Sequence, residues 1–193
     1  MSSRTTRLLA SSWVAAALFA TSAAHADLVT NGGFETGDFT GWSVVTDPLY
    51  DGVDVLAPQA GTYAAFFGGA NSSITQTLST VAGSNYKVSF WLQLESDPLG
   101  VAAPNAFSLD FGAATGMSLS DASAFGYTLY ELTFIAAGAS TNLTFNFSQG
   151  PAFWDLDSVQ VTLPEPGSIA LLAAAGLAGV AAGRRRKPAS APD

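Results

Sequence analysis

Two short acidic segments carry the side chains of this sequence that could do chemistry. Residues 31–42 read NGGFETGDFTGW, and residues 153–161 read FWDLDSVQV. In the second segment, the alternation of side chains along a strand predicts that Asp155 and Asp157 share a face with Val159 and Val161. If the valines face a core, we expect the two carboxylates to face it as well. A carboxylate in such a place is costly unless it is paired or bound to a metal ion.

Calcium is the ligand that these carboxylates would suit, because a hard cation prefers carboxylate and carbonyl oxygens. Residues 27–163 contain thirteen Asp or Glu residues and one basic residue, Lys87, which gives this region a net charge of −12. We therefore expect a calcium ion held by Glu35, Asp157 and backbone carbonyls, with Asp155 as a further metal candidate. The alternative is that Asp155 and Asp157 lie at a solvated strand entrance and need no partner.

Composition excludes several classes of function. The chain has no cysteine, and its one histidine, His25, lies in the N-terminal segment. These facts exclude an imidazole-based triad, the usual zinc sites and a disulfide framework. One lysine cannot neutralise the phosphates of a nucleic acid, so nucleic acid is excluded as a partner. A glycoside hydrolase uses two acidic side chains that flank the bond to be cleaved. With thirteen acids spread over residues 27–163, some pair is always available, so this signal is weak. We expect no enzyme and no catalytic residues.

Aromatic rings give a second class of candidate binding residue, since flat rings stack on the apolar faces of sugars. Trp91 falls on the polar side of its predicted strand, and Tyr50 lies in a predicted loop. We name Trp91 and Tyr50 as the candidate glycan-binding residues. The alternative for Trp91 is that it lies beneath a loop. Trp42, in contrast, is predicted to plug the core.

A period-two alternation of apolar and polar residues indicates the elements that must position these side chains. No stretch shows a helical stripe, and the separators are rich in turn residues. We predict one all-β domain over residues 27–163, an antiparallel β-sandwich of jelly-roll type with about eight strands. A closed barrel is the competing architecture. The irregular loops are predicted in PLYDGVDVLAPQ and ESDPLGVAAPN, and the strands in TYAAFFG, SITQTLS, NYKVSFWLQ, AFSLDF, YTLYELTF, TNLTFNF and DSVQVT.

Three runs of this domain together resemble the galactose-binding-like jelly-roll domains found in carbohydrate-binding modules. They are NGGFETGDFTGW, GTYAAFFGGANSSITQTLSTVAGSNYKVSFWLQ and DLDSVQV. The resemblance implies a structural calcium site made by an early Glu and a late Asp, which fall here at Glu35 and Asp157. Relatives often read Asp-Asp-Val at the late position, whereas this chain has Asp157, Ser158 and Val159, so one acidic side chain of the pattern is missing.

The first 26 residues are typical of a secretory signal peptide. Arg4 and Arg7 precede an apolar run from about Leu8 to Phe19, and the sequence AHA follows at residues 24–26. The run is well short of the ~20 residues that a bilayer needs, which argues against a membrane anchor. We expect signal peptidase to cleave after Ala26.

The C-terminus combines three features in a fixed order. The tripeptide Pro164, Glu165 and Pro166 comes first, then the uncharged apolar residues 168–183, then the basic residues Arg184, Arg185, Arg186 and Lys187, with residues 188–193 as a tail. As a helix, residues 168–183 would be about 24 Å long, and they could cross a bilayer of about 30 Å if it thins locally. Positive flanks stay in the cytoplasm, so the acidic domain is expected outside.

Residues 164–187 resemble the PEP-CTERM sorting signal of Gram-negative bacteria. This resemblance implies transient membrane insertion, processing by an exosortase-type transpeptidase and removal of the apolar helix, in systems that accompany exopolysaccharide production. A permanent single-span anchor is the alternative. We expect an exported protein of the cell envelope, cell surface or extracellular matrix, with a non-catalytic binding or structural role and exopolysaccharide as a candidate partner. The alternatives are a carboxylate-based glycoside hydrolase and a purely structural matrix protein with no ligand.

Overall fold

The computed structural model describes residues 27–97, 104–150 and 152–163. The predicted signal peptide, the predicted sorting signal with its apolar helix at 168–183, and the tail at 188–193 all lie outside these residues. The described ranges contain no helix with the length and hydropathy of a membrane span. The same ranges form ten β-strands.

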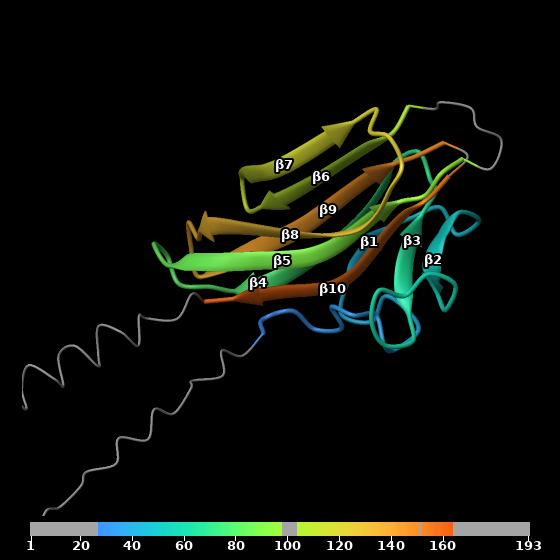
Figure 1. Ribbon diagram of the computed structural model, residues 1–193. Helices are drawn as coiled ribbons and strands as arrows, with labels where there is room; N and C mark the ends of the chain where they lie inside the picture. Colours follow the sequence, from blue (N-terminus) through green and yellow to red (C-terminus); the bar gives the residue numbers. More distant parts are fainter. Residues whose placement is uncertain (1–26, 98–103, 151, 164–193) are drawn as a thin grey trace, which may run out of the picture.

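The strands form two antiparallel sheets of five strands each, which lie one above the other (Figure 1). The antiparallel β-sandwich predicted from the alternation is therefore confirmed. The first sheet has the order β1 (Ser43–Val45), β4 (Ser72–Ser79), β9 (Ser140–Ser148), β6 (Ala106–Phe111) and β7 (Ala114–Ser120). The second sheet has the order β2 (Asp51–Asp54), β3 (Ala64–Phe67), β10 (Trp154–Thr162), β5 (Asn85–Leu94) and β8 (Phe125–Ile135).

All seven segments predicted as strands from their alternation are found in strands, namely β3, β4, β5, β6, β8, β9 and β10. Three strands were not predicted. β1 has three residues, all exposed, and β7 is half-buried or exposed along its whole length, so neither shows a buried face in its sequence. β2 lies inside PLYDGVDVLAPQ, so the prediction of an irregular loop there is wrong for Asp51–Asp54, which pair with β3. In ESDPLGVAAPN, residues 98–103 lie outside the described ranges.

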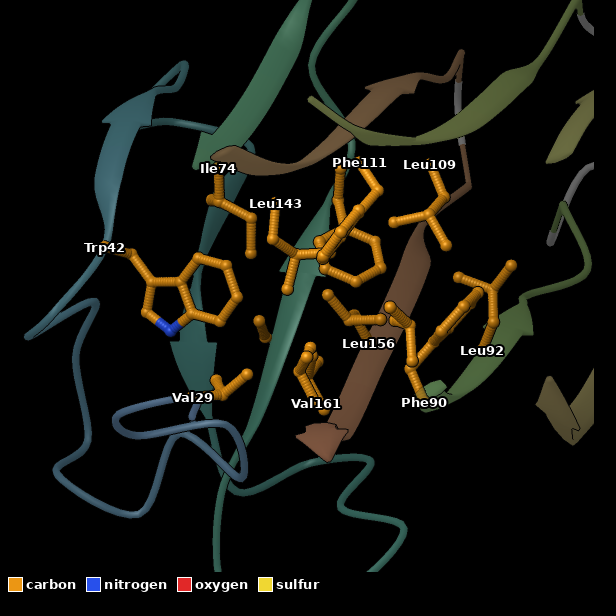
Figure 2. Close-up of a cluster of buried hydrophobic side chains, with 14 of the residues drawn as sticks. Val29, Trp42, Ile74, Phe90, Leu92, Leu109, Phe111, Leu143, Leu156 and Val161 are labelled. Atoms are coloured by element: carbon orange, nitrogen blue, oxygen red, sulfur yellow. The ribbon is translucent and has the colours of Figure 1, made fainter. Parts of the chain in front are cut away.

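The core between the sheets is built largely from aromatic rings that meet across the two layers. Phe67 and Phe147 stack with ring centroids 3.9 Å apart, and Phe90 meets Phe145 edge-on at 5.2 Å. Trp42 is 8% exposed, so its predicted role as a plug is confirmed. Figure 2 shows aliphatic side chains from both sheets packed in the same core as the rings of Trp42, Phe90 and Phe111.

The start of the domain runs along its last strand. Leu28 N donates to Val161 O at 2.9 Å, and Asp27 Oδ1 accepts from Val161 N at 2.9 Å. Val159 N donates to Gly32 O at 2.9 Å. A Cβ at Gly32 would lie 2.0 Å from Val159 O, so the approach requires glycine. The first residues after the predicted signal cleavage are thus fixed to the strand that leads to the predicted sorting signal.

Candidate functional site

The last strand, β10, contains a β-bulge that decides where its carboxylates point. The register with β5 shifts between Asp157 and Gln160, and Ser158 has a φ of +52°. The extra residue reverses the alternation, because a bulged strand opposes two residues to one. The prediction that Asp155 and Asp157 share the face of the two valines is therefore wrong, and both carboxylates lie on the outer face of the second sheet. The core residues of β10 lie on both sides of the bulge and are Trp154, Leu156, Val159 and Val161.

This outer face is covered by a flap, which we define as residues 55–62. Asp157 is 0% exposed, and its Oδ2 accepts from the flap amides of Gln59 at 2.9 Å and Ala60 at 3.0 Å. The Tyr127 hydroxyl, from β8, donates to Ala57 O at 2.7 Å. The flap therefore has contacts on β10 and on β8. A solvated strand entrance, the alternative considered for the two aspartates, does not fit their burial.

Asp155 belongs to a group of acids on the same face. It is 2% exposed and accepts from Gln93 Nε2 at 3.0 Å. Burial first, and then the charges of Glu95 and Asp54, raise the pKa of Asp155 to about 7, although the bond from Gln93 acts in the opposite direction. Burial and the charge of Asp54 also raise the pKa of Glu95. Asp155 is thus a carboxyl group that holds its proton close to neutral pH.

The Tyr127 hydroxyl lies within the field of the same acids. Burial raises the pKa of Tyr127, and the charges of Asp155, Asp157 and Glu95 add to this effect. The phenol consequently keeps its proton and stays a donor to the flap. Burial also raises the pKa of Asp157, whereas the hydrogen bonds that its carboxylate accepts from backbone amides act to lower this pKa.

An open hollow of about 530 Å³ lies at the end of β5, beside this group. It is lined by Gln93, Leu94, Glu95, Ser96, Ala124, Phe125 and Gly126. A glycoside hydrolase needs two carboxyl groups that flank one bond of the substrate. Here Asp155 is almost fully buried, so Glu95 is the acid of the hollow that a ligand can reach.

The two aromatic candidates for glycan binding lie in different places. Trp91, in β5, is half-buried on the outer face, opposite Leu129 of β8 and Asp157 of β10. Its predicted orientation away from the core is confirmed. Tyr50 is 52% exposed and lies directly before β2, and β3 and β10 separate β2 from β5. The structure does not bring Trp91 and Tyr50 into one site.

The structure does bring together two of the three predicted metal candidates. A Cβ at Gly33 would lie 3.7 Å from Glu35 Cγ and 3.8 Å from Asp157 Oδ1, so the Glu35 side-chain methylene and the Asp157 carboxylate both approach this glycine. Glu35 Oε1 accepts from Thr62 N at 2.9 Å, which ties it to the end of the flap. Asp155 is held by Gln93 instead and is not part of the pair.

The fit of this pair to calcium is partial. Carboxylate oxygens suit the ion. Glu35 Oε2 accepts one backbone amide, from Thr62, whereas Asp157 Oδ1 accepts both the amide and the hydroxyl of Ser158. In residues 27–97, 104–150 and 152–163, however, no group of three or more acidic, histidine or cysteine side chains is placed to hold a metal ion. Backbone carbonyls and water would have to supply the remaining ligands.

Sequence reasoning missed Asp51, whose carboxylate organises the turns at one end of β2 and β3. It is 8% exposed. Its Oδ1 accepts from Gly68 N at 3.0 Å and Gly69 N at 2.9 Å, and its Oδ2 accepts from Asp47 N and Ser72 Oγ. The nearby Asp-Gly and Gly-Gly pairs signal turns, but nothing in the sequence shows that this acid, rather than its neighbours, becomes the shared acceptor.

The segment NGGFETGDFTGW is organised by its first residue. Asn31 has a φ of +53°, and its Nδ2 donates to Thr36 Oγ1 at 2.7 Å, Asp38 O at 3.0 Å and Thr40 O at 3.0 Å. An Asn side chain tolerates this backbone region and bonds to nearby backbone groups. The segment therefore folds as a closed loop that presents Glu35 to the flap.

Comparisons with known proteins concern two parts of the chain, the C-terminal segment and the β-sandwich domain. The model of the PEP-CTERM protein-sorting motif matches residues 162–187. A comparison with curated protein sequences finds no match. Among solved structures, the domain is similar to TmCBM61, solved in complex with β-1,4-galactotriose, with a TM-score of 0.54 and 18% identity over 72% of this chain and 99% of that one.

Two further structures have a comparable similarity. The CBM22-1 xylan-binding domain of Paenibacillus barcinonensis Xyn10C gives a TM-score of 0.50 and 16% identity over 74% of this chain and 97% of that one. The K1 cleaved adhesin domain of Lys-gingipain from Porphyromonas gingivalis gives 0.51 and 10% identity over 68% of this chain and 96% of that one. At these identities the similarity shows the fold.

The sorting motif implies export and a membrane-anchored precursor, handled by an exosortase-type system of Gram-negative bacteria. The motif match starts at Thr162, the last residue of β10, so the sorting signal follows the folded domain directly. The chain thus joins a β-sandwich, similar in fold to the carbohydrate-binding modules TmCBM61 and CBM22-1, to a PEP-CTERM protein-sorting motif.

Proposed function

We propose that this protein is a non-catalytic glycan-binding domain that the exosortase-type system releases from its membrane helix and delivers to the cell surface or extracellular matrix. The observation that carries the proposal is the half-buried Trp91 on the outer face of a sandwich whose fold is that of carbohydrate-binding modules. Trp91 lies between β10 and β8, the two strands that the flap contacts, and the part of its ring that stays exposed would stack on a sugar. Burial of Asp155 supports binding rather than hydrolysis.

The charge of the domain narrows the class of glycan. Residues 27–163 carry a net charge of −12, and a field of one sign repels ligands of the same sign at low ionic strength. We therefore favour neutral polysaccharides, such as the neutral part of an exopolysaccharide, over polymers rich in uronate or sulfate. Lys87, the one basic residue of this region, already forms an ion pair with Glu131 and so offers little attraction to an acidic glycan.

Trp91→Ala should weaken binding of a neutral glycan by tenfold or more, about the effect of removing a buried aromatic anchor. The test is a glycan array that includes β-1,4-galactotriose and xylohexaose, followed by calorimetric titration of the best ligand. Trp91→Phe keeps a ring and should retain most of the affinity. Tyr50→Ala serves as the matched aromatic control, because Tyr50 lies at another edge of the sheet.

Two results would contradict this proposal. One is the absence of any glycan ligand for the wild-type protein on the array and on the exopolysaccharide of the host. The other is an affinity that Trp91→Ala leaves unchanged. Release of reducing sugar from a bound glycan would favour the glycoside hydrolase instead.

We also propose that Glu35 and Asp157, with backbone carbonyls, bind a structural calcium ion. Millimolar calcium should then raise the melting temperature of the wild-type protein, because an ion that binds the folded state alone stabilises it by about 2.7 kcal/mol at a hundred times its Kd. Glu35→Gln should abolish the shift, since an amide oxygen can still accept from Thr62 but carries no charge. The matched control is Glu95→Gln, which lies outside the pair. Calorimetric titration without a calcium signal would contradict this proposal.

A further inference from the structure

The strand β8 forms one open edge of the second sheet. Its eleven residues pair with β5 on one side, and no other strand of the described residues pairs with its second side. A free strand edge presents a row of unpaired N–H and C=O groups, which is a template for pairing with another chain. β8 is the longest of the four edge strands of the two sheets.

The edges of the two sheets are protected to different degrees. Proteins commonly block an edge by making it short or by placing charges or proline on it. β1 has three residues, and β2 carries an Asp at each end. β8, which reads FGYTLYELTFI, has no proline and one charged residue, Glu131, which forms an ion pair with Lys87 of β5. The edge formed by β8 is therefore close to neutral on a domain with a net charge of −12.

The outer face of β8 also carries two exposed aliphatic side chains, Leu129 at 44% and Ile135 at 67% exposure. They are six residues apart and so lie on the same face of the strand. If two copies of β8 pair antiparallel about a two-fold axis at Leu132, Leu129 of each copy lies opposite Ile135 of the other. In the same register Glu131 lies opposite Thr133, so no like charges face each other. The strand is thus self-complementary, as a two-fold interface requires.

We propose that two copies of this chain associate through antiparallel pairing of their β8 strands about Leu132, which joins two five-stranded sheets into one sheet of ten strands. A second copy is favoured over another partner because the pairing covers both exposed aliphatic residues of the strand and brings together two neutral edges of an acidic molecule. Self-repulsion of the remaining acids limits contact elsewhere. The pairing is independent of any glycan.

Cysteine pairs test the register directly, because the native chain has no cysteine. Leu129→Cys and Ile135→Cys are made separately in the full chain, isolated from the cell envelope in mild detergent and oxidised alone or mixed. A mixture should form disulfide-linked dimers, because directly opposite residues lie within disulfide reach. Each variant alone should not, because identical residues are then roughly 20 Å apart along the pair.

The absence of cross-linked dimers in the mixture would overturn the proposal. So would equal cross-linking of either variant alone, which indicates another register or a dimer held by other parts of the chain. Loss of glycan binding in the Trp91 variant would leave this result untouched, so the two proposals fail separately.

The double variant Leu129→Lys/Ile135→Lys tests the affinity. It places a lysine opposite a lysine of the second copy at two symmetric positions, and we expect the dimer dissociation constant to rise by about tenfold or more in sedimentation equilibrium. The matched control is Leu49→Lys/Val81→Lys, since these residues are 82% and 62% exposed and lie outside β8. Equal dissociation constants for the two double variants, with matching circular dichroism spectra, would contradict the proposal.

Discussion

Replacing Asp51 with alanine is expected to lower the free energy of unfolding by about 3–5 kcal/mol. The reason is the number of donors that depend on one buried carboxylate. Its two oxygens accept from three backbone amides and one hydroxyl, at Gly68, Gly69, Asp47 and Ser72. Of these donors, Gly69 and Ser72 are themselves buried. Alanine would leave donors in the interior without acceptors, and each such group costs about 1–3 kcal/mol.

Denaturant unfolding of the exported protein measures this loss. Asp51→Asn should give an intermediate value, because one oxygen remains an acceptor while the new amino group faces donors. The matched control is Asp54→Ala at the other end of β2, where the carboxylate accepts the single amide of Leu56 at 2.9 Å. That change should cost about 1 kcal/mol or less. A loss below about 1 kcal/mol for Asp51→Ala would show that water satisfies the turns without the carboxylate.

The strands that sequence could predict are those with one buried face. In β5, β6 and β9 buried residues alternate without interruption with half-buried or exposed ones, and their sequences alternate accordingly. β2 is different, since it has four residues, of which one, Asp51, is buried and polar. A strand whose buried residue is an acid cannot be recognised from an apolar pattern, because its stability comes from hydrogen bonds to distant turns.

The candidate site could be predicted from the sequence only where its strands are regular. Strand parity placed Trp91 on the outer face correctly, because β5 is regular at that point. Parity failed at Asp155 and Asp157, because one bulged residue, Ser158, reverses every position beyond it. The flap could not be predicted either, since its contact with Asp157 joins residues almost a hundred positions apart in the chain. Local pattern thus identifies faces, whereas long-range hydrogen bonds decide which faces are covered.

The stability of the domain should fall by about 3 kcal/mol between pH 5 and pH 8 because of Asp155. Burial and the charges of Glu95 and Asp54 raise the pKa of this carboxyl to about 7 in the folded state, against an ordinary value of 3.8. Between these two values the folded state binds more protons than the unfolded state. The free energy of unfolding therefore decreases as the pH rises, until Asp155 is ionised in both states above about pH 7. Asp157 and Glu95 act in the same direction, since their pKa values are also raised.

The variant Asp155→Asn distinguishes the contribution of Asp155 to the pH dependence of stability from the contributions of the other acids. The amide keeps an oxygen that can accept from Gln93 and carries no charge at any pH, so most of the decline above pH 5 should disappear and the variant should match or exceed the wild type at pH 8. Asp121→Asn removes the same charge at an exposed turn and should keep the wild-type decline. Denaturant unfolding of the three proteins at pH 5 and pH 8 makes the comparison. A decline that persists in Asp155→Asn would assign the pH dependence to Glu95 and Asp157. A wild-type stability that does not change with pH would mean that water or a bound cation reaches the Asp155 carboxyl.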